Sequence, residues 1–295
     1  MKRLALLALA GLLAATPAVP QSPEQRPVWN RAVEPFRILG NVHYVGTAEL
    51  AAYLLTSPRG HILIDGAMPE SADLIARNIQ RLGYRLRDVK LVLANHAHMD
   101  HAGGLARLKA LTGARLLASA GDRRELEAGR IAYRDPDDSW DFPPVKVDAL
   151  LRDGQRVRVG DTVLTTHLSP GHTKGCTSWT LKVREPGRAR EGGHPLDVLF
   201  ACSLTVAGQP LVGDRRYPQA AADFRRTFAK LRGLHADVFL NFHAGSFDLA
   251  AKRARLSGGD HLAFVDAAEL GRQLDRAEAA FVAELNRQRT IVGTK

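Results

Sequence analysis

The sequence predicts an α+β fold in which two similar halves pack sheet against sheet and helices cover both outer faces. Short apolar runs separated by Gly, Asn, Ser and Pro recur in both halves, as expected for strands. Helical segments follow at intervals in each half, so each sheet has helices that can cover one of its faces. The 295 residues contain neither an internal repeat nor a low-complexity linker, and they suffice for a sizeable core.

The first half begins with four short apolar runs that predict a meander of antiparallel strands: FRILG, VHYVGT, AAYLLTS and HILIDG. The segment MPESADLIARNIQRLGY predicts a helix, because it starts with acids and places Gly83 after its last turn. The β-branched run VKLVLAN predicts a buried strand that leads directly to His96. We expect a helix over 103–111 and a further strand at ARLLASA.

The second half opens with an irregular loop over 129–147 that carries three aromatic residues, Tyr133, Trp140 and Phe142. The segments VRVGDTVLTTHLS and CTSWTLKV predict strands that flank the turn PGHTKG, and DVLFACSLT predicts a further strand. A helix near 219–232, the strand ADVFLNF and a long helix over about 268–288 complete this half.

The N-terminal stretch MKRLALLALAGLLAATPAVPQS has the layout of a secretory signal peptide. Lys2 and Arg3 precede an apolar run, and small residues then offer a cleavage site. The run is shorter than the about 20 residues that a membrane span needs, and no later stretch is apolar enough to span a bilayer. We therefore expect a periplasmic protein with a signal peptide over 1–18 and one domain over 19–295, whose N-terminal arm covers about 19–35.

The formal net charge of +10 has the sign of a nucleic-acid binder, but the distribution of charge does not match one. Arg residues alternate with acids in GRAREGG and GDRRELEAGR, whereas a nucleic-acid surface clusters its basic residues on one face. We therefore expect a solvated surface, with no nucleic-acid and no membrane partner.

The state of the two cysteines, Cys176 and Cys202, depends on the compartment. In an oxidising compartment they can form one disulfide, whereas in the cytosol they would stay free thiols. The sequence alone leaves both states open.

The stretch NHAHMDHAGG places His96, His98, Asp100 and His101 within six positions. Buried polar side chains need partners, and four neighbours rarely all find them in a packed core. The density therefore favours a metal site or a proton relay, with a polar surface loop as the alternative. A metal site needs ligands from other strand ends, and His172 in SPGHTKG and His243 in NFHAGS both follow predicted strands.

These side chains divide into two groups of three, and each group would leave its metal ion a coordination position that no protein ligand fills. The first is a three-imidazole site with one position left for water, as in catalytic zinc: His96, His98 and His172. The second combines a carboxylate with two imidazoles: Asp100, His101 and His243. The nitrogen-rich donor set favours zinc, so we expect two Zn2+ ions that share a hydroxide. The remaining histidines stand singly and are expected to be structural or exposed: His43, His61, His167, His194, His235 and His261.

The motif HAHMDH, with the later GHT and NFH, resembles the H-x-H-x-D-H pattern of the metallo-β-lactamase superfamily. The resemblance covers nearly the whole mature chain. It implies a four-layer αββα sandwich with the metal site at the edge between the two β-sheets. It also implies that Asp65, in LIDGA, lies near the metals and supports ligand geometry; the alternative is a turn acid beside Gly66.

The segment DVLFACSLT distinguishes among members of this superfamily. Glyoxalase-type, lactonase-type and phosphodiesterase-type relatives place a metal-bridging aspartate here, whereas this chain has Cys202 and Ser203 and no acid before Asp214. The chain thus resembles the true β-lactamases, and among these subclass B3, because His101 stands where the first subclass has Arg. The second subclass has Asn in place of the first histidine, which His96 excludes.

Two registers of this segment remain open. In the favoured one Ser203 faces the metals and Cys202 bonds to Cys176, as equivalent cysteines do in some B3-like enzymes. A shift by one residue would turn Cys202 toward the metal instead.

The resemblance implies hydrolysis of penicillins, cephalosporins and carbapenems by a zinc-bound hydroxide, which would confer antibiotic resistance. Asp100 would be both a metal ligand and the group that passes a proton to the departing nitrogen. Ser203 and Thr205 would hydrogen-bond the substrate carboxylate, the alternative being that they cap the strand end. The loop aromatics would either form a wall above the metals or pack into the core.

Two rival classes of function remain. A lactonase or other ester hydrolase of the same fold would normally have the bridging aspartate that is missing here. A non-catalytic zinc-binding protein would tend to close its coordination shells with protein ligands. We therefore expect the protein to be a monomer and its partner to be a small-molecule β-lactam substrate.

Overall fold

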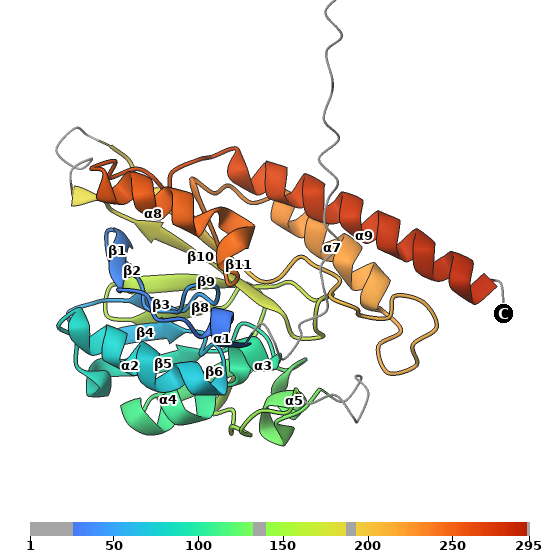
Figure 1. Cartoon of the computed structure of the whole chain (residues 1–295), viewed down its shortest axis with the longest axis horizontal. Helices are drawn as coiled ribbons and strands as arrows, with labels where there is room; N and C mark the ends of the chain where they lie inside the picture. The colour runs from blue at the N-terminus through green and yellow to red at the C-terminus, as the bar shows by residue number, and fades with distance from the viewer. Residues whose placement is uncertain (1–25, 132–139, 187–192, 294–295) are drawn as a thin grey trace, which may run out of the picture.

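The computed structural model describes residues 26–131, 140–186 and 193–293. The expected signal peptide over 1–18, the first part of the arm and Tyr133 lie outside these residues. Within them, two β-sheets face each other and helices cover the outer side of each sheet (Figure 1). This is the expected four-layer αββα sandwich, and the prediction of the fold is confirmed.

The first sheet has seven strands whose order in space follows their order in the chain. The first four form the predicted antiparallel meander, and the last three add in parallel. The strands are β1 (Phe36–Leu39), β2 (Val42–Tyr44), β3 (Tyr53–Leu55), β4 (His61–Ile64), β5 (Val89–Leu93), β6 (Arg115–Ser119) and β7 (Ala149–Leu151).

The second sheet has five strands in the order β12-β11-β10-β9-β8. Strands β8 to β11 are antiparallel neighbours, and β12 pairs in parallel with β11. The strands are β8 (Arg156–Val159), β9 (Thr162–Leu168), β10 (Thr177–Val183), β11 (Leu196–Ala201) and β12 (Val238–Asn241).

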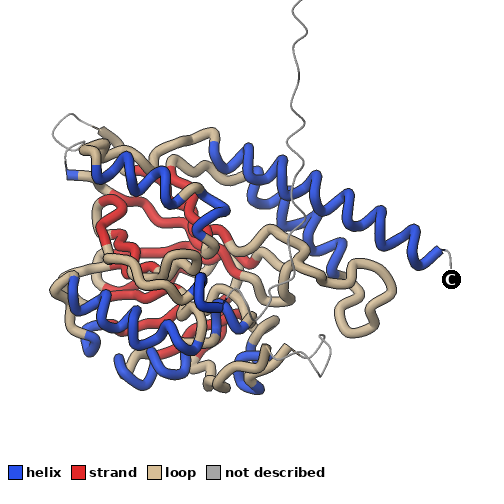
Figure 2. Tube along the Cα trace, viewed as in Figure 1, coloured by secondary structure: helices blue, strands red, loops and turns tan. Residues whose placement is uncertain are grey.

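Helices lie outside the two sheets, as Figure 2 shows in blue around the red strands. Those on the side of the first sheet are η2 (Pro69–Ser71), α2 (Ala72–Arg81), η3 (Leu86–Asp88), α3 (Met99–Ala102), α4 (Leu105–Thr112) and α5 (Arg123–Ala128). The later helices are α7 (Ala220–Arg232), η4 (Ala244–Phe247), α8 (Leu249–Ser257) and α9 (Glu269–Gly293). A short helix, α1 (Arg26–Trp29), precedes the first strand.

Alternate residues of β4 show how one sheet serves two cores. Leu63 belongs to the outer core with Ile75 of α2 and Leu105 of α4. Ile62 and Ile64 point the other way and belong to the core that includes the second sheet. Burial on both faces explains why this strand is apolar throughout rather than alternating.

The helix expected over 103–111 is α4 (Leu105–Thr112), which starts two residues later than expected, and the prediction did not include the preceding helix α3 (Met99–Ala102). Gly103 and Gly104 separate these two helices. The chain packs too closely here for side chains, since a Cβ on Gly104 would lie 2.2 Å from the carbonyl oxygen of Gly66. The prediction did not include α5, β7 and α8. Helix α5 and strand β7 are too short to show a period, and the buried residues of α8 are Leu249 and Lys252, which make no apolar stripe.

Two aromatic residues of the loop before β7, Trp140 and Phe142, lie in the core. Trp140 is 9% exposed and Phe142 is 5% exposed, and both belong to the outer core under the first sheet. Core packing, the second of the two alternatives for these aromatics, is therefore confirmed for Trp140 and Phe142.

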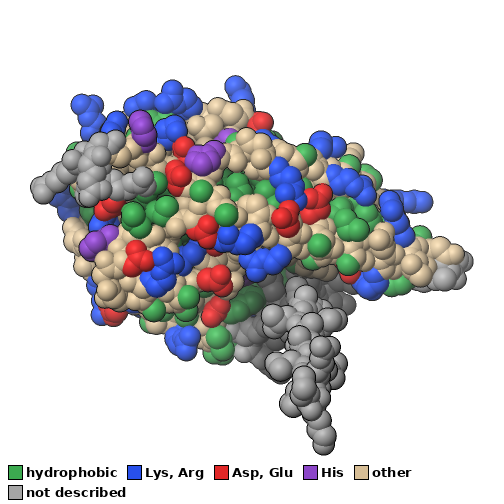
Figure 3. Space-filling view, turned by 90° about the horizontal axis from the view of Figure 1, so that it is seen from above, with side chains coloured by type: hydrophobic (Ala, Val, Ile, Leu, Met, Phe, Trp, Pro, Cys, Tyr) green, Lys and Arg blue, Asp and Glu red, His purple; other side chains and the backbone are tan. Residues whose placement is uncertain are grey.

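The surface carries mixed charge on the face seen in Figure 3, where Lys and Arg side chains are interspersed with Asp and Glu. This mixture matches the solvated surface expected from the sequence. Within the described part of the chain, none of the helices has the combined length and apolarity that crossing a bilayer requires.

Candidate metal centre

Six polar side chains meet at one edge of the sandwich, where β5, β9 and β12 end. The turn after β5 and helix α3 carry four of them, and the loops that follow β9 and β12 carry one each. They gather in the two groups expected from the sequence: His96 with His98 and His172, and Asp100 with His101 and His243. Strand ends from both sheets therefore converge as predicted.

In the three-histidine group the imidazole rings face one another. His96 Nε2 lies 3.2 Å from His172 Nε2. The ring centroid of His98 lies 4.7 Å from that of His96 and 4.5 Å from that of His172. All three side chains are buried. Lone pairs held this close in a buried site repel each other unless a cation lies between them.

Hydrogen bonds fix which ring nitrogen carries the lone pair. Asn95 donates from Nδ2 to the carbonyl oxygen of Thr177 (3.0 Å), which leaves its Oδ1 to accept a hydrogen bond from His96 Nδ1 (2.5 Å). His172 Nδ1 donates to the carbonyl oxygen of Thr205 (2.7 Å). Because both rings carry their hydrogen on Nδ1, Nε2 of each is left as a metal-binding base.

The second group is built around Asp100. Its Oδ2 lies 3.4 Å from His101 Nε2 and 3.4 Å from His243 Nε2, and these two nitrogens are 3.1 Å apart. On the other side of the His101 ring, Nδ1 donates to Asp65 Oδ2 (2.7 Å). This contact favours the supporting role expected for Asp65 over that of a turn acid.

Burial keeps most of these imidazoles neutral. It lowers the pKa of His172 to about 3 and that of His243 to about 4. The pKa of His96 lies well below its usual value for the same reason, helped by the neighbouring histidines. Neutral imidazole is the form that binds metal, so these side chains need not lose a proton first.

His101 and Asp100 form the charged part of the site. Burial lowers the pKa of His101, but the carboxylates of Asp100 and Asp65 outweigh it and raise that pKa to about 10. Burial also opposes ionisation of Asp100, but His101 and the other histidines hold the pKa of its carboxyl well below the usual range. A metal ion in this group therefore replaces a proton on His101 and meets an ionised carboxylate.

The donor atoms have the spacing of a zinc site. Zinc–nitrogen bonds of about 2.0–2.1 Å in tetrahedral geometry place two nitrogens about 3.3 Å apart. The Nε2 separations are 3.2 Å in the first group and 3.1 Å in the second. A donor set dominated by imidazole also suits zinc better than magnesium or calcium. The residues present fit two zinc ions.

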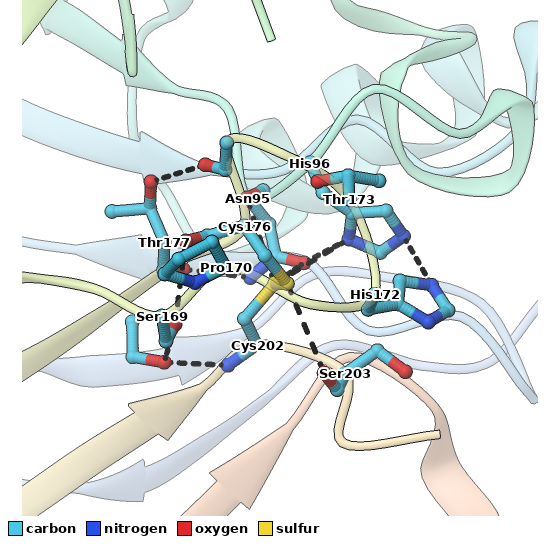
Figure 4. The surroundings of a disulfide bond; sticks show 12 residues. Asn95, His96, Ser169, Pro170, His172, Thr173, Cys176, Thr177, Cys202 and Ser203 are labelled. Atoms are coloured by element: carbon cyan, nitrogen blue, oxygen red, sulfur yellow. Dashed lines mark hydrogen bonds between the residues drawn. A yellow bond between two sulfur atoms is a disulfide. The ribbon is translucent and has the colours of Figure 1, made fainter. Parts of the chain in front are cut away.

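A disulfide between Cys176 and Cys202 packs against the three-histidine group on the Nδ1 side of His96 (Figure 4). The Cys202 Sγ lies 3.4 Å from Asn95 Oδ1 and 3.8 Å from His96 Nδ1. The bridge is thus confirmed, and the free-thiol alternative is wrong. The sulfur faces the Nδ1 side of His96, away from Nε2, which contradicts the shifted register with Cys202 as a metal ligand.

Ser203 and Thr205 lie just past β11, beside His172. Their hydroxyl oxygens are 3.0 Å apart, and the Thr205 N–H points at Ser203 Oγ from 3.4 Å. Ser203 is buried and Thr205 is exposed, so this pair of hydroxyls leads from His172 toward solvent. Between β11 and Asp214 the chain offers hydroxyls and no carboxylate.

The open side of the second group is formed by α1 and by the loop after β12. Backbone hydrogen bonds of 2.9 Å join Ala51 N to Phe242 O and Ala244 N to Glu49 O, which holds His243 against the loop between β2 and β3. The His243 side chain is 28% exposed, and the Trp29 ring centroid lies 6.1 Å from its ring. An aromatic surface therefore borders the solvent-facing ligand.

Sequence reasoning did not assign a role to Asn95 or to the Thr205 carbonyl. Asn95 had a local signal, since it directly precedes His96. The carbonyl of Thr205 had none, because it meets His172 across 33 residues of chain through a backbone atom that every residue carries.

Comparison with known proteins agrees with this geometry. Residues 50–185 match the family model described as the metallo-beta-lactamase superfamily. Among solved structures, BJP-1, a subclass B3 metallo-beta-lactamase of Bradyrhizobium japonicum, is similar with a TM-score of 0.85 and 38% identity. That match covers 91% of this chain and 99% of the other.

Curated relatives found by sequence carry other names. A hydroxyacylglutathione hydrolase of Cereibacter sphaeroides is 33% identical over 64% of this chain and 69% of its own length. The N-acyl homoserine lactonase AttM of Azorhizobium caulinodans is 29% identical over 46% of this chain and 60% of its own length. Another hydroxyacylglutathione hydrolase is matched over as little as 27% of its length, so this likeness does not extend through the whole of such proteins. By these matches, and by its fold, the chain belongs to the metallo-β-lactamase superfamily of hydrolases.

Proposed function

We propose that this protein is a zinc-dependent β-lactamase of the subclass B3 type, which opens the amide of β-lactam antibiotics and so confers resistance. The observation that carries the proposal is the set of side chains just after β11. A disulfide-bonded Cys202 and the hydroxyl pair of Ser203 and Thr205 lie there, where lactonase-type members would have a bridging carboxylate. Similarity to BJP-1 over nearly the whole of both chains supports the same assignment.

Two Zn2+ ions would occupy the site. His96, His98 and His172 would hold one, and the group around Asp100 would hold the other. When bound, zinc supplies a Lewis acid and lowers the pKa of a coordinated water toward neutrality.

Asp100 would handle the proton of the reaction. Hydrolysis adds water across the amide: a C–O bond forms, the C–N bond breaks, and the nitrogen leaves with a proton. Asp100 is buried and ionised, and its Oδ2 lies between His101 and His243. Its carboxylate can accept the proton of the attacking water and pass it to the departing nitrogen.

Ser203, Thr205 and Trp29 would orient the substrate. The two hydroxyls lie beside His172 and can donate hydrogen bonds to the carboxylate that β-lactams carry. Trp29, against His243, offers an apolar face for the body of the substrate. Open imidazole groups with hydroxyls on one side and an aromatic ring on the other suit a small anionic substrate.

The test is hydrolysis of a penicillin, a cephalosporin and a carbapenem by the purified mature protein. Each would be measured as isolated, after chelator treatment and after zinc is restored. We expect turnover that is lost with chelator and recovered with zinc, and that Asp100→Asn abolishes. The exposed Asp73 serves as the matched control, since Asp73→Asn should leave turnover unchanged. A folded protein that holds two zinc ions but turns over none of the three would contradict the proposal.

Hydrolysis of a thioester or lactone is the second candidate. The names of the curated relatives favour it. A hydroxyacylglutathione and an N-acyl homoserine lactone belong in the same assay, and a kcat/KM for either that exceeds those for all three β-lactams would favour this candidate.

We also propose that the protein is an exported monomer, with a signal peptide over 1–18 and a single domain over 19–295. The disulfide between Cys176 and Cys202 supports an oxidising compartment such as the periplasm. The mass of the protein recovered from a periplasmic fraction tests the cleavage, and light scattering during size exclusion tests the oligomeric state.

A further inference from the structure

One buried carboxylate joins the two loops that carry the three-histidine group. Asp122 is 2% exposed. Its Oδ2 accepts hydrogen bonds from the backbone N–H of Ala97 (3.0 Å) and from the Thr173 hydroxyl (2.8 Å), and its Oδ1 accepts one from the backbone N–H of Gly175 (2.8 Å). Ala97 lies between His96 and His98, and Thr173 directly follows His172. One side chain therefore holds the backbone beside all three ligands.

The position of Asp122 in its own element makes this use of the side chain unusual. Asp122 directly precedes α5, where an aspartate normally accepts a hydrogen bond from the first turn of the helix. Here the side chain makes no capping hydrogen bond and turns away from α5 toward the two loops. The local stabilisation of a short helix is thus given up for contacts 25 and 51 residues distant in the sequence.

Two glycines allow the close approach that these contacts need. A Cβ on Gly121 would lie 2.3 Å from the carbonyl oxygen of Lys174. A Cβ on Gly175 would lie 2.6 Å from the carboxyl carbon of Asp122. Both distances are below any real contact, so the turn before α5 and the loop after His172 fit only without side chains at these positions.

We propose that Asp122 is a positioning residue for the three-histidine zinc site. A buried carboxylate needs hydrogen-bond donors, and the donors to Asp122 come from both loops that carry the zinc ligands. The separation of the two loops is therefore fixed by one rigid group. That separation sets the distance between His96 Nε2 and His172 Nε2. Asp122 contacts no substrate and no reacting atom in this scheme, and it acts only through the ligands.

The test measures zinc affinity by chelator competition, with wild type, Asp122→Asn and Thr173→Val. In Asp122→Asn one carboxylate oxygen becomes an NH2 group, which cannot accept, so the backbone N–H of either Ala97 or Gly175 loses its acceptor. We expect it to weaken zinc binding at one of the two sites by about 10- to 100-fold, the usual effect of losing a group that orients metal ligands. Thr173→Val, which leaves both backbone hydrogen bonds in place, should show a smaller loss, and Thr173→Ser should restore wild-type affinity.

The matched control is Asp148→Asn. Asp148 also accepts a backbone N–H, that of Leu116 (2.7 Å), but it joins β6 to the loop before β7 and contacts no ligand loop. We expect it to lower the melting temperature without changing zinc affinity. With Co2+ in place of zinc, the visible absorption bands should shift in Asp122→Asn and stay the same in Asp148→Asn.

The inference rests on the proposed zinc binding, and the two can fail separately. A wild-type protein that binds no zinc would remove the proposed function. A wild-type protein that binds two zinc ions, with Asp122→Asn and Thr173→Val binding them equally well, would overturn the positioning role. If Asp122→Asn does not fold, the comparison of Thr173→Val with Thr173→Ser decides the question.

Discussion

Asn95 and Thr177 join the two sheets directly behind the three-histidine group. The backbone N–H of Thr177 donates to the carbonyl oxygen of Asn95, and the Asn95 side chain donates back to the Thr177 carbonyl oxygen, each over 3.0 Å. The same side chain accepts the hydrogen of His96 Nδ1. One residue therefore links the sheet interface to the tautomer of a metal ligand.

This link predicts that Asn95→Ala lowers both stability and zinc affinity. The lost hydrogen bonds should cost about 1–3 kcal/mol of the free energy of unfolding, and the freed His96 ring should weaken zinc binding by about 10- to 100-fold. Urea unfolding and chelator competition measure the two effects. Asn41 is the matched control, because its side chain also joins the sheets, to Thr56 O (2.8 Å) and Thr162 Oγ1 (2.9 Å). Equal zinc affinity in Asn95→Ala and Asn41→Ala would contradict the link.

The contact between Asp65 and His101 predicts that Asp65→Asn weakens zinc binding at the second group only. Asp65→Asn keeps a side chain that tolerates the left-handed backbone at this position, where φ is +72°. It removes the negative charge that faces His101 Nδ1. We expect about a 10- to 100-fold loss of zinc affinity at one site while the other keeps its affinity. Isothermal titration with zinc, which resolves two binding steps, checks this; loss at both sites would show a general distortion instead.

The disulfide predicts a large stability effect. Closing 26 residues of chain between Cys176 and Cys202 should contribute about 3.5 kcal/mol through the entropy of the unfolded state. The double variant Cys176→Ala/Cys202→Ala should lose about that much in urea unfolding. Wild type with reductant should approach the same value, whereas the variant should not respond to reductant. Wild type and double variant unfolding at the same urea concentration would refute this account.

The ligands could be predicted from the sequence because each follows an apolar strand. The run VKLVLAN ends in His96, and the strands before His172 and His243 are equally clear, so convergence at one sheet edge followed. The resemblance added the position of the metal site at the edge between the two sheets and the pairing of Cys176 with Cys202. Both depend on which segments lie side by side, and no single segment carries that information.

The supporting contacts could not be predicted. Asp122 follows ASAG with the appearance of an ordinary helix cap, and its partners Ala97 and Thr173 lie on two distant loops. Helix α3 was missed for a related reason: its four residues are too few to show a hydrophobic period, and the carbonyl of Gly66 that packs against Gly104 belongs to a distant segment. Tertiary contacts of this kind override local pattern.

Buried histidines outside the site predict that stability falls in acid. His43 is buried with its ring 5.4 Å from that of Tyr84, and burial lowers its pKa below the ordinary 6.5. Below about pH 6.5 the unfolded state therefore binds more protons than the folded state, so the free energy of unfolding decreases as the pH decreases. Chelator-treated His43→Gln should lose less stability than wild type between pH 7 and pH 5. Equal slopes for wild type and His43→Gln would rule out this role for His43.

Trp29 predicts an effect on substrate binding without an effect on the metals. Its ring lies against His243 and Trp140, and its carbonyl accepts the Thr47 hydroxyl, so α1 is fixed beside the open side of the site. Trp29→Ala should raise KM for β-lactams about tenfold, which corresponds to about 1.4 kcal/mol of lost apolar contact. The kcat and the zinc content should change little, because Trp29 is not a metal ligand and makes no hydrogen bond to one in the part of the chain that the structure describes. Val28, 52% exposed on the same helix, is the control, and Val28→Ala should match wild type in steady-state kinetics. If Trp29→Ala instead lowers kcat and zinc content at unchanged KM, the ring supports His243 rather than the substrate.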